Sequence, residues 1–137
     1  MTEAKTVNIN ASHFLKYDLD KIINYSGRQR VDLKPSNISN LHPLADYFPL
    51  RLKQAERLTY CVAKAISKMH DEPRKPYQTI IILYYLDELY SREVQEKVGY
   101  SHSRYGILRK RAEDEFTGYF NYFCDKEGLS SIIKLIN

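Results

Sequence analysis

The fold is decided by residues 89–112, LYSREVQEKVGYSHSRYGILRKRA, which predict two helices joined by a glycine turn. Ser91 can cap the first helix, and Gly99 is suited to end it because glycine adopts a left-handed backbone at low cost. Ser101 can cap the second helix, in which apolar residues recur every three or four positions. These apolar residues are Tyr105, Leu108, Ala112 and Phe116. Two helices with such a turn are typical of the helix-turn-helix.

Once the apolar side is turned inward, the outer face of the second helix carries mainly polar and basic side chains. A recognition helix presents its N-terminal residues to base edges in the major groove, while neighbouring groups contact phosphates. Arg104 suits bidentate contact with guanine, and Ile107 suits contact with a thymine methyl. Gly106 costs about 1 kcal/mol of helix propensity relative to alanine, which suggests close approach of the backbone to DNA. The base-edge candidates are His102, Ser103, Arg104, Gly106 and Ile107. The phosphate candidates are Arg92, Tyr100, Ser101, Arg109, Lys110 and Arg111.

The positive charge of the chain is concentrated in this helix. The net charge is +4 and the isoelectric point is about 9.0, which favours an anionic partner. Residues 97–111 hold five Lys and Arg and no acidic residue, whereas residues 113–137 hold five acids and two bases. A basic helix face is often only solvated. Here, however, the two caps, the glycine turn, the apolar spacing and the basic run all occur within residues 89–112. We therefore expect an interface with duplex DNA.

The rest of the chain predicts further helices, so the expected fold class is all-α. Residues 11–25 place apolar side chains at helical spacing, with Ser12 available as the cap and Gly27 just beyond the end. Residues 26–50 contain three prolines and several Ser and Asn, which predicts a long loop that is either a functional arm or poorly ordered. In residues 51–69 apolar side chains recur every three or four residues, which predicts an amphipathic helix.

The apolar run that follows Pro76, TIIILYYLDEL, suits either a buried helix or a buried strand. We predict a helix, because the neighbouring segments are helical and no partner strand is visible. The expected organisation is an N-terminal helix with a long loop or arm over residues 1–50, followed by a helical body over residues 51–137. The helix-turn-helix, with an extended recognition helix, lies at about residues 77–124 of this body.

The C-terminal residues carry more apolar side chains than a minimal helix-turn-helix needs. An aromatic stripe from Phe116 to Phe123 either packs on the chain's own helices or forms a homodimer seam. Gly128 is expected to break the helix, and Ser130 can cap a short C-terminal helix in SSIIKLIN. That last segment is apolar enough to dock on the body or on a second subunit.

Composition argues against several other classes of protein. Hydrophobic residues make up 43% and charged residues 28%, and no apolar run approaches the ~20 residues of a membrane span. The N-terminus lacks the pattern of a signal peptide, so we expect a cytoplasmic protein. Cys61 and Cys124 are expected to be buried and unpaired, and no metal or cofactor is predicted. We find no nucleophile–base pair, phosphate loop or metal-spaced carboxylates, so no enzyme is predicted. The acids at 87–88 and 113–115 are expected to be solvated faces or helix-end charges.

Residues 82–120, ILYYLDELYSREVQEKVGYSHSRYGILRKRAEDEFTGYF, resemble the helix-turn-helix of sigma-factor region 4. More narrowly, they resemble the ArpU-type regulators of phages and prophages in Gram-positive bacteria. The features that match are an apolar helix with a Tyr-Leu pair, then Gly-Tyr-Ser, then a tyrosine-bearing helix that runs into a basic cluster. Gln95 departs from the pattern, in which a small residue is usual. The resemblance implies a phage late-gene transcription activator that acts with the host RNA polymerase in the bacterial cytoplasm.

Two other functions stay open. A phage small terminase subunit also joins a helix-turn-helix to an oligomerising helical region, and ring-like oligomers would favour that function. The other is binding of single-stranded nucleic acid, because the chain has twelve tyrosines and aromatic rings stack on bases. Most of these tyrosines fall on core-like positions, and Tyr47 and Tyr100 are the exceptions.

Overall fold

The computed structural model describes residues 6–40 and 50–136, and these are mostly helical. The helices and strands are β1 (Val7–Asn10), α1 (Ala11–His13), α2 (Leu19–Ser26), α3 (Leu50–Lys68), α4 (Tyr77–Ile81), α5 (Ser91–Val98), α6 (His102–Lys126) and β2 (Ile133–Ile136). A π-helical turn at Phe14–Asp18 joins α1 to α2, and another at Ile82–Leu86 continues α4. The predicted all-α class is confirmed, since the described strands form only one short parallel pair.

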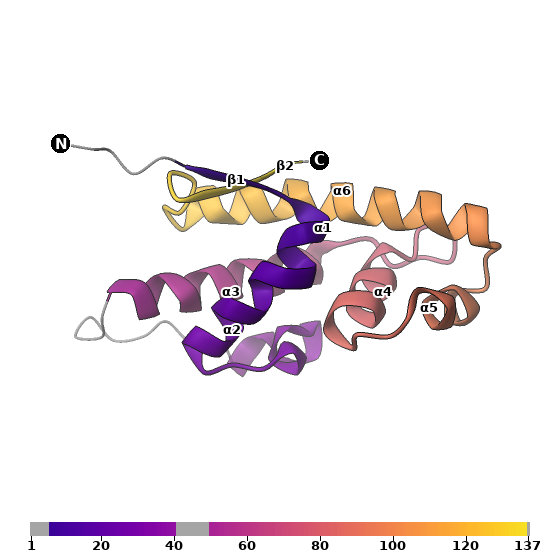
Figure 1. Ribbon diagram of the computed structural model, residues 1–137, viewed down its shortest axis with the longest axis horizontal. Coiled ribbons are helices and arrows are strands. Elements are labelled where there is room, and N and C mark those ends of the chain that lie inside the picture. Colours follow the sequence, from indigo (N-terminus) through magenta and orange to yellow (C-terminus); the bar gives the residue numbers. More distant parts are fainter. Residues whose placement is uncertain (1–5, 41–49, 137) are drawn as a thin grey trace.

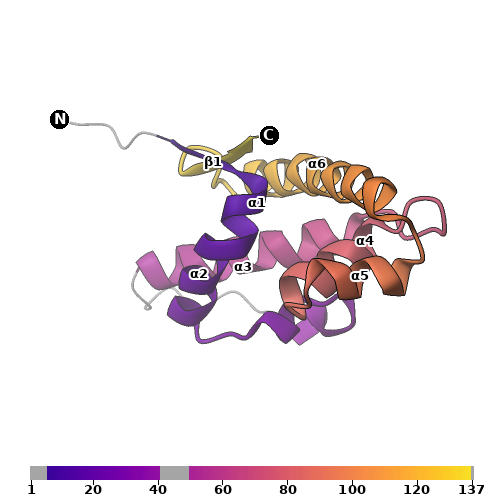
Figure 2. The same cartoon turned by 45° about the vertical axis from the view of Figure 1, so that its right-hand side comes forward.

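The longest helix, α6, organises the molecule. Its 25 residues give a rod of about 37 Å. Figure 1 shows α6 along one side, with α4 and α5 against its N-terminal half and α3 running beneath it. In Figure 2 the same arrangement is turned, and α1 and α2 cross over α3 from the strand pair. The N-terminal half of α6 is thus held by the helices that immediately precede it in the chain.

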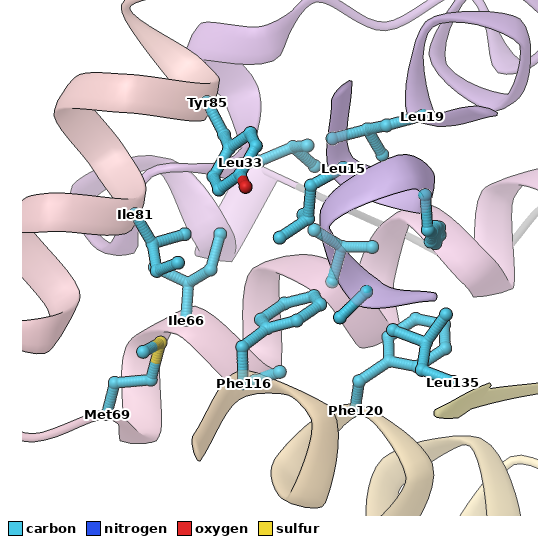
Figure 3. Packing of buried hydrophobic residues seen from close by; sticks show 14 of the residues in the cluster. Leu15, Leu19, Leu33, Ile66, Met69, Ile81, Tyr85, Phe116, Phe120 and Leu135 are labelled. Carbon is cyan, nitrogen blue, oxygen red and sulfur yellow. The ribbon is translucent and has the colours of Figure 1, made fainter. Parts of the chain in front are cut away.

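A single hydrophobic core joins these elements, as Figure 3 shows. Phe116 and Phe120 of α6 are fully buried in it and stack on each other with ring centroids 5.7 Å apart. Phe14 meets Phe120 edge to face at 5.1 Å, a favourable geometry for two aromatic rings. Of the two predictions for the aromatic stripe, packing on the chain's own helices is therefore confirmed at these two positions. Phe123 is half-buried.

The predicted helix boundaries agree with the structure at most ends. α2 ends at Gly27, whose φ of 75° is left-handed as expected. The segment at residues 51–69 is α3, and the apolar run after Pro76 is helical. The first cap is different, because the side chain of Asn10 accepts a hydrogen bond from the Ser12 backbone N–H at 3.0 Å. The prediction that Ser12 caps this helix was wrong by two residues.

The predicted loop of residues 26–50 is more ordered than expected where it is described, and its residues 41–49 lie outside the described part. It contains two 3₁₀ helices, Arg30–Leu33 and Pro35–Asn40. Leu33 is fully buried, and the Arg30 side chain lies 2.7 Å from both Asp20 and Glu88. These anchors are tertiary contacts, which composition does not reveal.

The predicted short C-terminal helix was wrong, because these residues form β2. Ile133 and Leu135 are buried while Lys134 and Ile136 are exposed, the alternation of a strand with one covered face. β2 pairs in parallel with β1, from Val7 opposite Ile133 to Asn10 opposite Ile136. The expectation that this segment docks on the body is confirmed by its packing on α6.

Candidate nucleic-acid interface

The turn between α5 and α6 has the geometry that the sequence predicts. Gly99 has a φ of 77°, and its N–H donates to the carbonyl of Gln95 at 3.0 Å, which ends α5. Ser101 has an extended backbone, and its hydroxyl accepts from the Arg104 N–H at 3.3 Å, which starts α6. Both predictions are confirmed. The turn fixes the direction in which α6 leaves the motif.

The start of α5 differs from the prediction. Tyr90 is the cap residue, and the Glu93 carboxylate accepts a hydrogen bond from its backbone N–H at 3.3 Å. Ser91, predicted to be the cap, is the first helical residue instead. Its hydroxyl accepts a hydrogen bond from Arg109 of α6 at 3.4 Å, so it links the two helices.

The inward face of the motif is the predicted one. Val94 of α5 is fully buried, and so is the row of side chains predicted for α6. That row consists of Tyr105, Leu108, Ala112 and Phe116, which are 0–3% exposed. Gln95, which departs from the usual small residue, is half-buried rather than fully inserted between the helices. The exposed side chains on the first turns of α6 are therefore available to a partner.

A buried polar cluster ties α6 to the helix that supports it. The Tyr85 hydroxyl donates to Glu113 Oε2 at 2.6 Å, and Glu113 is only 7% exposed. Arg109 lies 3.7 Å from the same carboxylate, and its guanidinium sits 4.9 Å above the Tyr84 ring. Burial and the neighbouring Glu113 raise the pKa of Tyr85. Glu113 is buried in the middle of α6, so the expectation that it is a solvated or helix-end charge was wrong.

This cluster changes the position of one candidate residue. Arg109 was predicted to contact phosphate, but the structure turns it toward Ser91, Glu113 and the Tyr84 ring. Nearby Glu113 raises the pKa of Arg109 and burial lowers it, with a net increase. Arg109 therefore stays charged and links α6 to α5, and its side chain is 36% exposed, so it is partly withdrawn from the outer surface.

The five base-edge candidates share the exposed side of the first two turns of α6. They are His102, Ser103, Arg104, Gly106 and Ile107, and Ile107 is 47% exposed although it is apolar. A methyl group added at Gly106 would meet no atom within 4 Å, so nothing in the described chain requires glycine there. Gly106 and Ile107 are therefore adjacent on the exposed side of α6, where both are accessible to a partner.

Apart from Arg109, the phosphate candidates fall into two groups. Arg92, Lys110 and Arg111 are exposed, and Arg104 and Arg111 make no ion pair with the described residues. Lys110 lies 3.5 Å from Asp114 and Arg92 lies 3.7 Å from Glu96. These are exposed pairs one helical turn apart, which contribute about 0.3–0.5 kcal/mol and leave the cations available.

Ser101 and Tyr100 form the second group, because their polar atoms are already used. The Ser101 hydroxyl caps α6, and the Tyr100 hydroxyl donates to the carbonyl of Pro73. Pro73 belongs to the turn between α3 and α4, which also exposes Arg74 and Lys75, two cations that the sequence analysis did not consider. Tyr47, the other exposed tyrosine expected from the sequence, lies outside the described residues.

The sign of the charge changes along α6. Its first turns carry Arg104, Lys110 and Arg111, whereas the following turn carries exposed Asp114 and half-buried Glu115. An anionic rod laid on the whole helix would meet these carboxylates, but one laid on the N-terminal turns would not. The charge pattern therefore limits an anion-binding surface to about three turns of α6.

The described part of the chain was also searched for metal sites, paired cysteines and membrane-spanning helices. Among residues 6–40 and 50–136, no group of three or more His, Cys, Asp and Glu side chains is placed to hold a metal ion. Cys61 and Cys124 are both buried and free, as predicted. No described helix is both long enough and apolar enough to pass through a bilayer.

The chain was also compared with known proteins. No family model, curated protein or solved structure matches it. What the protein does must therefore be inferred from the chemistry of its own surface, and the outer face of the first turns of α6 is the surface with the clearest chemistry.

Proposed function

We propose that the protein binds duplex DNA in a sequence-specific manner, with the N-terminal turns of α6 in the major groove, and regulates transcription. The observation that carries this proposal is the outer face of residues 102–111. It is exposed and free of acidic side chains, and it belongs to a helix whose opposite face is buried in the core. An α-helix fits the major groove, and the first residues of a recognition helix meet the base edges there.

Each exposed side chain then has a distinct role. Arg104 donates two hydrogen bonds to guanine, His102 and Ser103 contact neighbouring base edges, and Ile107 packs on a thymine methyl. Lys110 and Arg111 bind phosphates along one edge of the groove. Arg92 binds a phosphate from the start of the preceding helix, as first helices of such motifs cross the backbone.

The test compares a base contact with a phosphate contact. Duplexes that bind are selected from a random pool, and affinities are measured by gel shift for the wild type, Arg104→Ala and Lys110→Ala. We expect Arg104→Ala to cost about 1–3 kcal/mol and to relax base preference, and Lys110→Ala to weaken all sequences alike. Lys134→Ala, which removes an exposed cation on β2, serves as the control. Unchanged affinity for both α6 variants would contradict the proposal.

We further propose that the regulated genes are phage late genes and that the protein activates them with the host RNA polymerase. The resemblance of residues 82–120 to ArpU-type regulators supports this narrower role. In vitro transcription from a promoter recovered by genome-wide binding should rise when the protein is added to bacterial polymerase. A fall in transcript would support a repressor instead.

The predicted homodimer remains a prediction. Phe116 and Phe120 are buried within their own chain, so a seam would have to use other residues. Light scattering at micromolar concentration distinguishes the outcomes. A dimer that protects a promoter supports regulation, and a ring-like oligomer supports the alternative role of a small terminase subunit in DNA packaging.

A further inference from the structure

The chain between α3 and α4 makes a tight turn at Glu72–Lys75. The Glu72 N–H donates to the Lys75 carbonyl at 3.1 Å, and the Lys75 N–H donates to the Glu72 carbonyl at 2.9 Å. Pro73 and Arg74 form the tip between them. Two reciprocal hydrogen bonds around a two-residue tip, with φ fixed at Pro73, make this turn a rigid hairpin.

Three side-chain contacts hold the hairpin against the helix-turn-helix. Tyr100 directly precedes Ser101, the N-cap residue of α6, and its hydroxyl donates to the Pro73 carbonyl. The Glu115 carboxylate of α6 accepts from the His70 backbone N–H at 2.7 Å and lies 2.7 Å from His70 Nδ1. Asp71 accepts from the hydroxyl of Thr79 in α4 at 2.6 Å. The hairpin is thus fixed at its tip and at its base.

These anchors also determine which side of α6 the hairpin borders. Residues one or two helical turns apart lie on one side of a helix, so Arg104, Arg111 and Glu115 follow one row. The hairpin is anchored to Glu115, the last member of this row, and to Tyr100, just before its first member. Figure 2 shows the connection from α3 to α4 beside the start of α6. The hairpin therefore runs alongside the arginines of the proposed interface.

We propose that this hairpin is a second phosphate-binding element, in which Arg74 and Lys75 contact the sugar–phosphate backbone beside the groove that α6 occupies. Both side chains are exposed and make no ion pair with the described residues. The Asp71 carboxylate is turned away to Thr79, so the charged side chains left on the hairpin are Glu72, Arg74 and Lys75, with a net charge of +1. Because the turn is already rigid, its cations bind phosphate without further ordering of the backbone. Tyr100 is a positioning residue that aims the tip.

This inference rests on the proposed function, and its test does not require knowledge of the operator. Phosphate contacts are independent of sequence, and each one contributes about 0.9 to the slope of log affinity against log salt. A fluorescein-labelled duplex of mixed sequence is titrated with the full chain at several salt concentrations, with binding followed by anisotropy. We expect Arg74→Ala/Lys75→Ala to lower the slope by about 1.8.

Three further variants sharpen the test. Lys21→Ala/Lys134→Ala removes two exposed cations from α2 and β2, and should leave the slope unchanged. Glu72→Gln removes an exposed negative charge from the hairpin and should tighten binding. Tyr100→Phe should weaken binding in the wild type, but should cause no further loss in the Arg74→Ala/Lys75→Ala background, because the hydroxyl acts only through the tip.

The possible failures are distinguishable. If Arg111→Ala lowers the salt slope while Arg74→Ala/Lys75→Ala behaves like the Lys21/Lys134 control, the hairpin proposal is overturned and DNA binding by α6 stands. If Tyr100→Phe weakens binding equally in both backgrounds, Tyr100 contacts DNA itself, and its positioning role is overturned. If the wild type does not bind the duplex at any salt concentration, the proposed function fails together with this inference.

Discussion

Replacing Tyr85 with phenylalanine tests whether the buried polar cluster holds the recognition helix in place. The substitution removes one hydroxyl, which donates to the 7%-exposed Glu113 carboxylate at 2.6 Å. A hydrogen bond to a charged group contributes about 1.5–3 kcal/mol. Among the described residues, the carboxylate left behind then has only the more distant Arg109 as a partner. We therefore expect the free energy of unfolding to fall by about 2 kcal/mol.

The corresponding shift in melting temperature follows from the length of the chain. Unfolding entropy near 60 °C is about 2.1 cal/mol/K per residue, so 137 residues give roughly 290 cal/mol/K, and 2 kcal/mol lowers Tm by about 7 °C. Because the chain has no tryptophan, urea unfolding is followed by far-ultraviolet circular dichroism. The urea m-value should not change, since the fold is the same.

The matched control is Tyr84→Phe, one residue away. Its ring, on which Arg109 lies, is retained, and its hydroxyl makes no hydrogen bond to the described residues. We expect a change within about 0.5 kcal/mol, the usual range for a substitution that disturbs no buried contact. Equal stability of Tyr85→Phe and the wild type would refute the argument, because Glu113 would then not need its hydroxyl partner.

Three further outcomes are expected. Gly106 and Gly118 are both exposed in α6 with open space around an added methyl, so Gly106→Ala and Gly118→Ala should each stabilise the protein by about 0.5–1 kcal/mol. Only Gly106→Ala should weaken duplex binding, and equal affinities of the two variants would remove Gly106 from the interface. Asn121→Ala, which loses two 2.9 Å hydrogen bonds to the Leu135 backbone, should cost about 1–3 kcal/mol in urea unfolding, and a smaller loss would mean that water replaces the amide. The stability gap between the wild type and Tyr85→Phe should narrow above about pH 10, because the pKa of Tyr85 is raised in the folded state and the unfolded chain ionises first. A constant gap in urea unfolding up to pH 11 would speak against that raised pKa.

Local signals predicted the helix-turn-helix well. The ends of its helices depend on single residues with strong backbone preferences, and Gly99 and Ser101 have the expected geometry. The inward row of α6 follows from spacing alone, because the helical period assigns one side to the core. The missed cap at Ser91 was an error of one residue, since Glu93 supports Tyr90 in the same role.

Apart from the two misplaced caps, the errors have a common physical origin in contacts between distant parts of the chain. Arg109 was placed on the outer face because its charge is visible in the sequence, but its partners in α5 and the π-helical turn are not. Arg30 orders the segment after α2 through Asp20 and Glu88, which are remote in sequence from one another. The strand pair escaped prediction because four residues at one end of the chain are matched only by four at the other.

That pairing of distant ends has a consequence for how the molecule is made. Thr6 and Ser131, which flank the paired strands, are 125 residues apart, so a ribosome that adds about 5–20 residues per second needs roughly 6–25 s to supply the second strand after the first. Throughout that interval the first strand has no neighbour to satisfy its amides. The two strands can therefore pair only after the helices between them have been synthesised, whereas those helices can pack on one another earlier.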